Sequence, residues 1–325
     1  MRPVKKLLIL SFALPLACAS NAIIIRDDVA DSKYTDLAAD PLYDAVGRIN
    51  YTTSGATGVA TGNFIGTSDG KKWLVSAAHV LDQGITAATF TVAGRAYDLK
   101  VSSIRYISNY DSGKWDIGVA QILDPDNNLT IDPVRFSNAT VPIPAKVDDH
   151  IIATGVGFGR TGDGKTGSTK ASGTKRAFNE RIDALGLTYN QGRGQLFGYI
   201  SDFDDGKASG NTLDATDFAA ARFSAGQASV RDQLDLEGNV AEGDSGGGLF
   251  MDDGCCSTVM IGIASVSNRL GSGGLYTYGA NSIWSPIDKD MADKITGWTG
   301  IAAVPEPCTY IVLGLGIAAF QRRRR

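Results

Sequence analysis

The sequence contains few cysteines, and their positions limit how the fold can be stabilised. Of the four cysteines, Cys18 and Cys308 lie near the two ends of the chain, and only Cys255 and Cys256 lie in its body. Because these two are adjacent, a disulfide between them could close a tight loop but could not join distant segments. With only two histidines besides, no zinc-ligand spacing is present. We therefore expect a fold that is stabilised by packing, with no metal and no cofactor.

Positive charge and helical periodicity are also scarce. The formal net charge is −4, and the only dense basic cluster is the arginine run at residues 322–325. Binding to nucleic acid therefore has no support in the sequence. Outside residues 288–298 there is no sustained helical pattern, while short strand-like apolar runs and 39 glycines are present. This pattern favours an all-β protein.

A single serine stands among glycines at residues 243–247, in the segment Gly-Asp-Ser-Gly-Gly. Small residues on both sides let the backbone turn tightly, so that the N–H groups of Gly243 and Ser245 can point at one developing oxyanion. A neutral hydroxyl is a poor nucleophile unless a base lies within reach and a third group orients that base. The segment therefore predicts a nucleophile only if the chain also supplies a histidine and a carboxylate.

Both groups occur upstream of Ser245. His79 follows an apolar strand-like run and two alanines, so no bulky side chain crowds it. The other histidine, His150, follows two aspartates, and we interpret it as a solvated residue at a strand edge. Asp116 opens another apolar run, where partial burial would make it an acceptor for the imidazole N–H. The order along the chain is His79, Asp116, Ser245.

In this order, the Ala-Ala-His segment at His79, the Asp-Ile-Gly-Val-Ala segment at Asp116 and the Gly-Asp-Ser-Gly-Gly segment at Ser245 resemble the three catalytic motifs of the chymotrypsin/trypsin-like serine proteases. The resemblance extends from about residue 45 to about residue 298. It implies two packed six-stranded antiparallel β-barrels and a short C-terminal helix. Two departures are Gly248, where the family usually has proline, and Val80, where many members have a disulfide-bonded cysteine.

The resemblance implies a role for each matched residue. His79 would be the general base and later the acid, Asp116 its orienting carboxylate, and Ser245 the nucleophile. Gly243 and Ser245 would donate their N–H groups to the oxyanion, and Ser265 would contact both the aspartate and the substrate backbone. The predicted activity is that of a serine endopeptidase acting through an acyl-enzyme. An inactive, surface-displayed binding module with the same fold is the alternative.

Local spacing from the serine also predicts a substrate pocket. By the resemblance, Asn239 falls at the floor of the primary pocket, and Ser267 and Gly274 fall at its walls. No carboxylate stands at the floor. We therefore expect the pocket to prefer a small or medium uncharged side chain over lysine or arginine.

Asp244 implies an activation step. In the family, the aspartate before the nucleophile pairs with a new N-terminal ammonium, and this ion pair shapes the oxyanion hole. Ile23 would become the N-terminus if signal peptidase cut after Ala22. Export itself would then supply the ammonium.

Residues 1–22 have the charged start, apolar centre and small-residue exit of a secretory signal peptide, with cleavage after Ala19 or Ala22. At the other end, Pro305-Glu306-Pro307, an apolar segment and the basic cluster resemble a PEP-CTERM sorting signal of Gram-negative bacteria. This implies recognition by an exosortase-type enzyme, and an ordinary C-terminal membrane anchor is the alternative. We expect an exported protein in the periplasm, on the outer surface or outside the cell, with at least transient membrane contact through the tail.

The expected organisation is therefore a signal peptide over residues 1–22, a protease domain over 23–300 and a sorting tail over 301–325. Within the domain, the first barrel would span about residues 43–135, the second about 145–287 and the helix about 288–298.

Two further motifs carry less weight. Residues 159–166 match the phosphate-loop pattern, which would suggest an NTPase, but the following residues lack the apolar face of a helix and an exported protein has no access to ATP. We interpret residues 159–173 as a surface loop. Residues 202–206 form an acidic turn that fails the EF-hand register, and we interpret it as a solvated loop rather than a calcium site.

Overall fold

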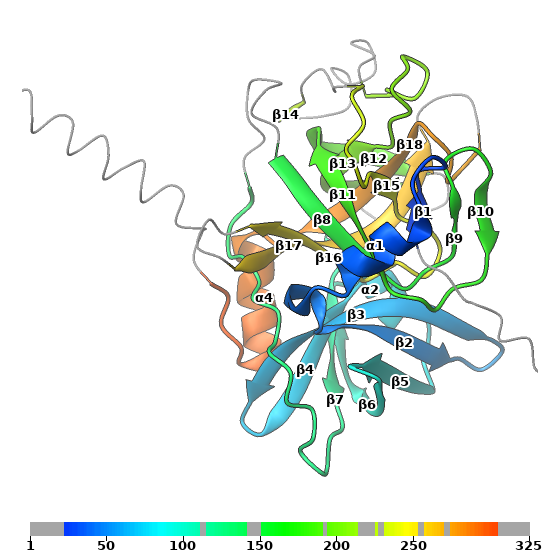
Figure 1. The fold of residues 1–325 in the computed structure, drawn as a ribbon. Coiled ribbons are helices and arrows are strands. Elements are labelled where there is room, and N and C mark those ends of the chain that lie inside the picture. The colour runs from blue at the N-terminus through cyan, green and yellow to red at the C-terminus, as the bar shows by residue number, and fades with distance from the viewer. Residues whose placement is uncertain are drawn as a thin grey trace, which may run out of the picture.

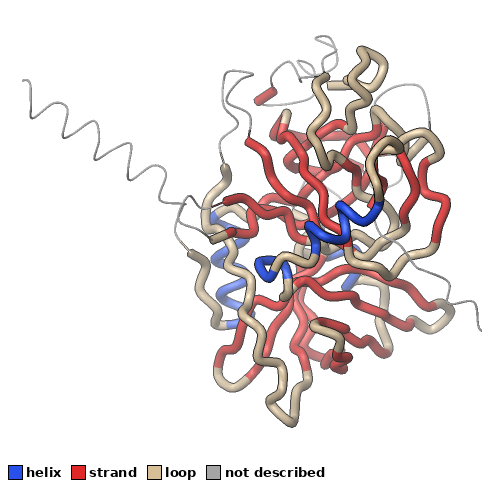
Figure 2. The backbone as a smooth tube through the Cα atoms, viewed as in Figure 1, coloured by secondary structure: helices blue, strands red, loops and turns tan. Residues whose placement is uncertain are grey.

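The computed structural model describes residues 23–110, 115–141, 151–190, 194–213, 225–226, 231–252, 257–269 and 274–304. The predicted signal peptide, residues 305–325 of the predicted sorting tail, His150 and the two adjacent cysteines lie outside these residues. Two β units pack against each other, one formed by the first part of the chain and one by the second (Figure 1). Strands predominate throughout the backbone trace (Figure 2), so the all-β prediction is confirmed.

The first unit is a closed antiparallel barrel in the order β2-β3-β4-β7-β6-β5. Its strands are β2 (Val46–Thr52), β3 (Thr57–Ser68), β4 (Lys71–Ser76), β5 (Ala87–Val92), β6 (Arg95–Tyr106) and β7 (Gly118–Ile122). Ile49, Leu74 and Phe90 are completely buried in its core. Gly47 permits this packing, because a Cβ atom there would lie 2.5 Å from the Phe90 ring. The predicted six-stranded first barrel is therefore confirmed.

The second unit is an antiparallel sheet of eight strands that curls into a half-barrel. Its order is β11 (Arg176–Ile182), β8 (Ile151–Gly157), β16 (Gly248–Asp252), β17 (Thr258–Arg269), β18 (Ala280–Pro286), β13 (Gly194–Asp202), β12 (Ala184–Asn190) and β14 (Ala225–Gly226). The sheet stays open because β12 pairs with β13 and β14 and not with β11. The chain passes from β11 to β12 at Asp183, whose N–H donates to the Ile200 carbonyl at 3.0 Å.

A small third sheet holds the start of the described chain. In it, β1 (Ile23–Ile25) lies between β9 (Thr161–Asp163) and β15 (Gly238–Asn239), and β10 (Gly167–Lys170) pairs with β9. Residues 159–173, interpreted above as a surface loop, therefore contain a β-hairpin. No helix begins at Thr166, so the phosphate-loop geometry is missing there.

Two helical segments next to β1 lie against the second unit. Helix α1 (Asp31–Ala38) contacts β11, and the short helix η1 (Pro41–Tyr43) follows it. The guanidinium of Arg176, itself completely buried, donates from Nε and Nη2 to the two carboxylate oxygens of Asp31, both at 2.6 Å. This bidentate contact fixes α1 across the sheet.

The C-terminal helix α4 (Lys289–Thr299) matches the predicted one. Asp288 caps it by accepting from the Met291 N–H at 2.9 Å, and Gly300 ends it with φ of 76°. Its buried face packs on the core of the first barrel. Among the described residues, no helix is both long and apolar enough to cross a membrane.

Hydrogen bonds join the two β units along their contact. The Thr61 N–H of β3 donates to the Ser245 carbonyl at 2.9 Å, and the Asn63 side-chain amide donates to the Gly246 carbonyl at 2.8 Å. Elsewhere along the contact, the Asp116 N–H, also of the first unit, donates to the Ser285 hydroxyl of the second unit at 2.8 Å. The three predicted catalytic segments therefore all lie at the contact between the units.

Candidate active site

The turn at residues 243–247 requires glycine at two positions. Gly243 and Gly246 have φ angles of 94° and 88°, in the left-handed region that favours glycine. A Cβ atom on Gly246 would lie 2.0 Å from the Ser76 Oγ and 2.2 Å from the Thr61 carbonyl oxygen. Because the first barrel approaches so closely, both units determine where Ser245 lies.

The structure brings His79, Asp116 and Ser245 together. His79 comes from helix α2 (Ala78–Leu81), Asp116 precedes β7 and Ser245 precedes β16. The His79 Nε2 lies 2.9 Å from the Ser245 Oγ, and the His79 Nδ1 lies 2.5 Å from the Asp116 Oδ2. Both distances are those of hydrogen bonds. The three side chains therefore form one continuous hydrogen-bonded series.

Asp116 is almost completely buried and accepts hydrogen bonds on both oxygens. Its Oδ1 accepts from the His79 backbone N–H at 2.8 Å, and its Oδ2 also accepts from the Ser265 hydroxyl at 2.6 Å. Burial alone would raise its pKa, but the charge and hydrogen bonds of His79 and the Ser265 hydroxyl hold that pKa below the ordinary value. An ionised Asp116 is an acceptor for Nδ1–H, which leaves Nε2 to accept the Ser245 proton.

The N–H groups of Gly243 and Ser245 lie on the same turn as the serine hydroxyl. Within the part of the chain that the structure describes, neither N–H donates to another protein group. The Gly243 carbonyl, in contrast, is held by the Thr61 hydroxyl at 3.0 Å. The turn thus leaves two donors available next to the Ser245 hydroxyl.

A cavity of about 260 Å³ opens beside Ser245. It is lined by Val240, Ala241, Glu242, Ser245, Ala264, Ser265, Val266, Ser267 and Tyr276. The predicted pocket residues Ser265 and Ser267 therefore lie on its wall. Asn239 is completely buried behind Ser267 and donates to the Ser267 Oγ at 2.8 Å. Gly274 is exposed and does not line the cavity, because the chain turns so that Tyr276 lies on the wall instead.

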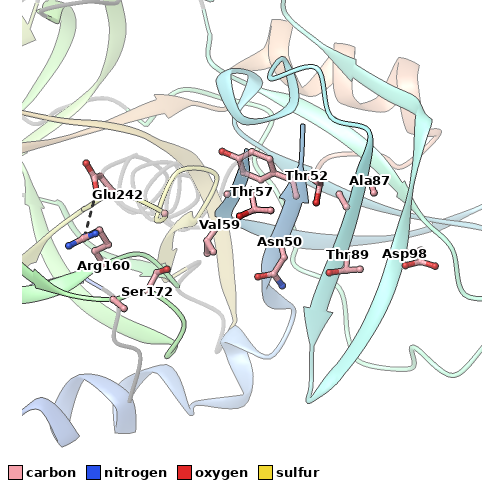
Figure 3. Close-up of a pocket in the computed structure, with 15 residues that line it drawn as sticks. Asn50, Thr52, Thr57, Val59, Ala87, Thr89, Asp98, Arg160, Ser172 and Glu242 are labelled. Atoms are coloured by element: carbon pink, nitrogen blue, oxygen red, sulfur yellow. Dashed lines mark ion pairs between the residues drawn. The ribbon is translucent and has the colours of Figure 1, made fainter. Parts of the chain in front are cut away.

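A larger hollow of about 630 Å³ begins at Gly243 and runs along the first barrel (Figure 3). Its barrel side is formed by residues of β2, β3 and β5, among them Asn50, Thr57 and Thr89. On the opposite side, the Arg160 Nε lies 3.6 Å from the Glu242 Oε2 in an exposed ion pair. Two hollows therefore meet at the Gly243–Ser245 turn.

Asp244 is turned away from both hollows and is completely enclosed by backbone. Its Oδ1 accepts from the Gly159 N–H at 2.7 Å, its Oδ2 accepts from the Ala241 N–H at 2.9 Å, and the Ile23 N–H also hydrogen-bonds the carboxylate. Burial raises the pKa of Asp244 to about 7, against these hydrogen bonds and the positive charge of Arg176. The predicted pair of Ile23 and Asp244 is thus in contact.

The acidic turn at residues 202–206 differs from the prediction. Asp202 and Asp204 are only 5% and 4% exposed, so the interpretation as a solvated loop is wrong for both. The turn is drawn inward because Asp202 Oδ2 accepts from the Leu213 N–H at 2.9 Å, and the Asp204 N–H donates to Glu237 at 3.1 Å. Across the described ranges, no group of histidine, cysteine and carboxylate side chains is arranged to hold a metal ion.

Comparison with known proteins supports the fold. No family model and no curated protein matches the sequence. Solved structures do match, among them HL collagenase with 17% identity and a TM-score of 0.50 over 82% of this chain and 96% of that one. Another is protease Anisep from Arthrobacter nicotinovorans, with 12% identity and a TM-score of 0.46 over 79% of this chain and 96% of that one. A third is the thermostable serine protease AL20 from an extremophilic microorganism, with 11% identity and a TM-score of 0.47 over 79% of this chain and 97% of that one. The chain therefore has the fold of the chymotrypsin-like serine proteases.

The close approach at Gly246 gives a first testable prediction. We expect Gly246→Ala to destabilise the protein by roughly 1–3 kcal/mol or more, because the new Cβ clashes with backbone at a positive φ. Thermal unfolding measures this. Gly297→Ala is the matched control, since a Cβ there meets nothing within 4 Å and alanine is favoured inside α4 by about 0.5–1 kcal/mol. Equal melting temperatures for the two variants would contradict the packing described here.

Proposed function

We propose that this protein is an exported serine endopeptidase that hydrolyses peptide bonds through Ser245, His79 and Asp116. The observation that carries the proposal is the continuous hydrogen-bonded series from the Ser245 Oγ through His79 to the buried Asp116. The N–H groups of Gly243 and Ser245, which donate to no other group of the described residues, complete the set of groups that acyl transfer needs.

In the first half of the proposed reaction, His79 Nε2 takes the Ser245 proton while the Oγ bonds to the substrate carbonyl carbon. The carbonyl oxygen becomes an oxyanion, which accepts from the N–H groups of Gly243 and Ser245. Asp116 stabilises the imidazolium that forms. His79 then gives the proton to the leaving amine as the C–N bond breaks, and an acyl-enzyme remains.

In the second half, water replaces the amine. His79 takes a proton from the water as its oxygen attacks the acyl carbon, and then returns a proton to the Ser245 Oγ as the ester bond breaks. The acid product leaves and the enzyme is regenerated. Every proton is therefore transferred through one nitrogen atom, the Nε2 of His79.

The two hollows suggest where a substrate chain lies. The side chain before the cleaved bond would enter the cavity next to Ser265 and Ser267, and the leaving part would follow the larger hollow beyond Gly243. Among the described residues that line the smaller cavity, the only carboxylate is that of Glu242, whose side chain is 64% exposed and pairs with Arg160. This arrangement supports a preference for small or medium uncharged side chains.

Export is part of the proposal. Residues 1–22 would direct the chain across the inner membrane, and residues 301–325 would act as the sorting tail. An exosortase-type enzyme would recognise Pro305-Glu306-Pro307, and the tail would hold the protein at the membrane at least transiently. These assignments depend on the sequence motifs alone.

Covalent labelling with a fluorophosphonate tests the nucleophile. We expect wild-type protein to be labelled and Ser245→Ala not to be labelled, because only a serine activated by a neighbouring histidine attacks the reagent at a useful rate. Intact mass and gel fluorescence report the adduct. Thermal unfolding of both proteins controls for folding. Folded wild-type protein that takes no label would favour the inactive binding module.

The contact between Ile23 and Asp244 supports activation by export. The backbone nitrogen of Ile23 already lies against the buried carboxylate of Asp244. Cleavage after Ala22 would convert this nitrogen from an amide into an ammonium. A buried carboxylate that loses its charged partner destabilises a protein by about 3–5 kcal/mol. The ammonium would therefore keep Asp244 ionised and would hold the 243–247 turn in the geometry described above.

We expect protein that starts at Ile23 to be labelled at least tenfold faster than protein that starts at Ala22, since the latter has a neutral amide at the same place. Labelling rates of the two forms, each released from a fusion tag, measure the effect. Asp244→Asn is the control, because it should make the two forms equally slow. Equal rates for the two wild-type forms would reject activation through this pair.

A further inference from the structure

The larger hollow lies over a row of outward-facing side chains on the first barrel. Neighbouring strands pair Val59 with Asn50, Asn50 with Thr89, and Thr89 with Asp98. Side chains that lie directly opposite each other in a sheet point to the same face. Phe90, the residue after Thr89, is completely buried in the barrel core, so the row lies on the outer face. Figure 3 shows the four side chains following one another across the hollow.

The polar groups of this outer row are not used within the protein. Among the described residues, no hydrogen bond joins the Asn50 amide, the Thr89 hydroxyl or the Asp98 carboxylate to another group. By contrast, the side chains of Thr61 and Asn63, farther along β3, both bind the 243–247 turn. The outer row therefore presents hydrogen-bonding groups to whatever lies in the hollow.

The charges that line the hollow differ between its two ends. Near the 243–247 turn, Arg160 pairs with Glu242, and the Arg160 Nε also donates to the Ser168 Oγ at 3.2 Å. At the far end stands Asp98, which is exposed and forms no ion pair within the described residues. Lys100 lies two residues farther along β6, on the same face, but it does not pair with Asp98. The far end of the hollow therefore carries an uncompensated negative charge.

The length of the outer row determines which part of a substrate would reach Asp98. A Cβ atom on Gly243 would lie 3.6 Å from the Val59 carbonyl oxygen, so the row begins beside the turn that carries Ser245. Neighbouring strands are about 4.8 Å apart, which places Asp98 roughly 14 Å from Val59 across three strand spacings. An extended peptide advances about 3.3 Å per residue and covers this distance in about four residues. With one further residue at the turn, Asp98 lies opposite about the fifth residue after the cleaved bond.

We propose that the outer row binds the leaving segment of the substrate, and that Asp98 selects a lysine or arginine near the fifth residue after the cleaved bond. The short polar side chains of Asn50 and Thr89 leave room for a peptide backbone and would hydrogen-bond to it. This inference rests on the proposed function, since it assigns a substrate class to the hollow in which the leaving segment would lie.

A positional scan of peptides tests the assignment. All peptides share the residues around the cleaved bond and carry a single lysine at one position from the third to the eighth after it, with glutamine at the others. Each kcat/KM value is divided by that of the peptide without lysine, using protein that starts at Ile23. Mass spectrometry confirms that the same bond is cleaved throughout.

We expect a maximum near the fifth position, with kcat/KM raised about three- to fivefold at low ionic strength, because an exposed ion pair is weak. Lysine at the third or eighth position should have little effect. In about 1 M salt the maximum should disappear, since charges are then screened within about 3 Å.

Four variants separate a contact with substrate from a merely structural role. Asp98→Asn should remove the maximum, and Asp98→Lys should replace it with a preference for glutamate at the same position. Lys100→Gln should raise the maximum, because a competing cation is removed. Asp69→Asn is the matched control, since Asp69 is an exposed carboxylate in the turn between β3 and β4 and does not line the hollow. Thermal unfolding confirms that each variant folds.

The outcomes distinguish the two proposals. Cleavage of all peptides without a maximum, or a maximum that persists in Asp98→Asn, overturns the role of Asp98 and leaves the endopeptidase intact. An equal effect of lysine at every position reports only general attraction to an acidic protein and overturns it too. If the Asp98 variants do not fold, an unchanged maximum in Lys100→Gln counts against the role in the same way. Failure to cleave any peptide rejects the proposed function and this inference with it.

Discussion

The buried carboxylate of Asp116 is the interaction on which the candidate site depends. It accepts hydrogen bonds from the backbone N–H and the ring of His79 in the first β unit and from the Ser265 hydroxyl of the second. The Asp116 backbone N–H in turn donates to the Ser285 hydroxyl of the second unit. A buried charge is tolerated only when hydrogen bonds compensate for lost solvation, so the two units must dock correctly for Asp116 to ionise. The same docking places Gly246 against the first barrel and sets the distance from Ser245 to His79.

Two further buried carboxyl groups lie behind the site in the second unit. Asp244 is enclosed by backbone N–H groups below the 243–247 turn, and Glu180 on β11 accepts from the Trp284 indole N–H of β18. Burial raises the pKa of both groups, to about 7 and about 8. Each pKa therefore lies near physiological pH, and Asp244 directly precedes Ser245 in the 243–247 turn. A buried carboxyl group that faces neither hollow can in this way influence the geometry of the 243–247 turn.

The sequence predicted those features that short, local motifs encode. The all-β class, the helical pattern near the C-terminus and the segments around Ser245, His79 and Asp116 follow from local patterns. The first barrel was implied by the resemblance that the order of these three segments carries. Features that depend on distant neighbours were not predictable. The open edge of the second sheet results from pairing of β12 with β13 and β14, and the burial of Asp202 depends on a loop eleven residues later. Glu180 could not be recognised either, because its partners come from β13 and β18, and only folding brings these strands to β11.

The central claim is that Ser245 and His79 together hydrolyse peptide bonds, and digestion of an unfolded protein tests it most directly. Protein that starts at Ile23 is incubated with a reduced and alkylated substrate protein in water enriched in ¹⁸O, and the products are analysed by mass spectrometry. We expect peptides whose new C-termini carry ¹⁸O, and none from Ser245→Ala prepared in the same way. The absence of such peptides from folded wild-type protein, or their formation by Ser245→Ala, would contradict the claim.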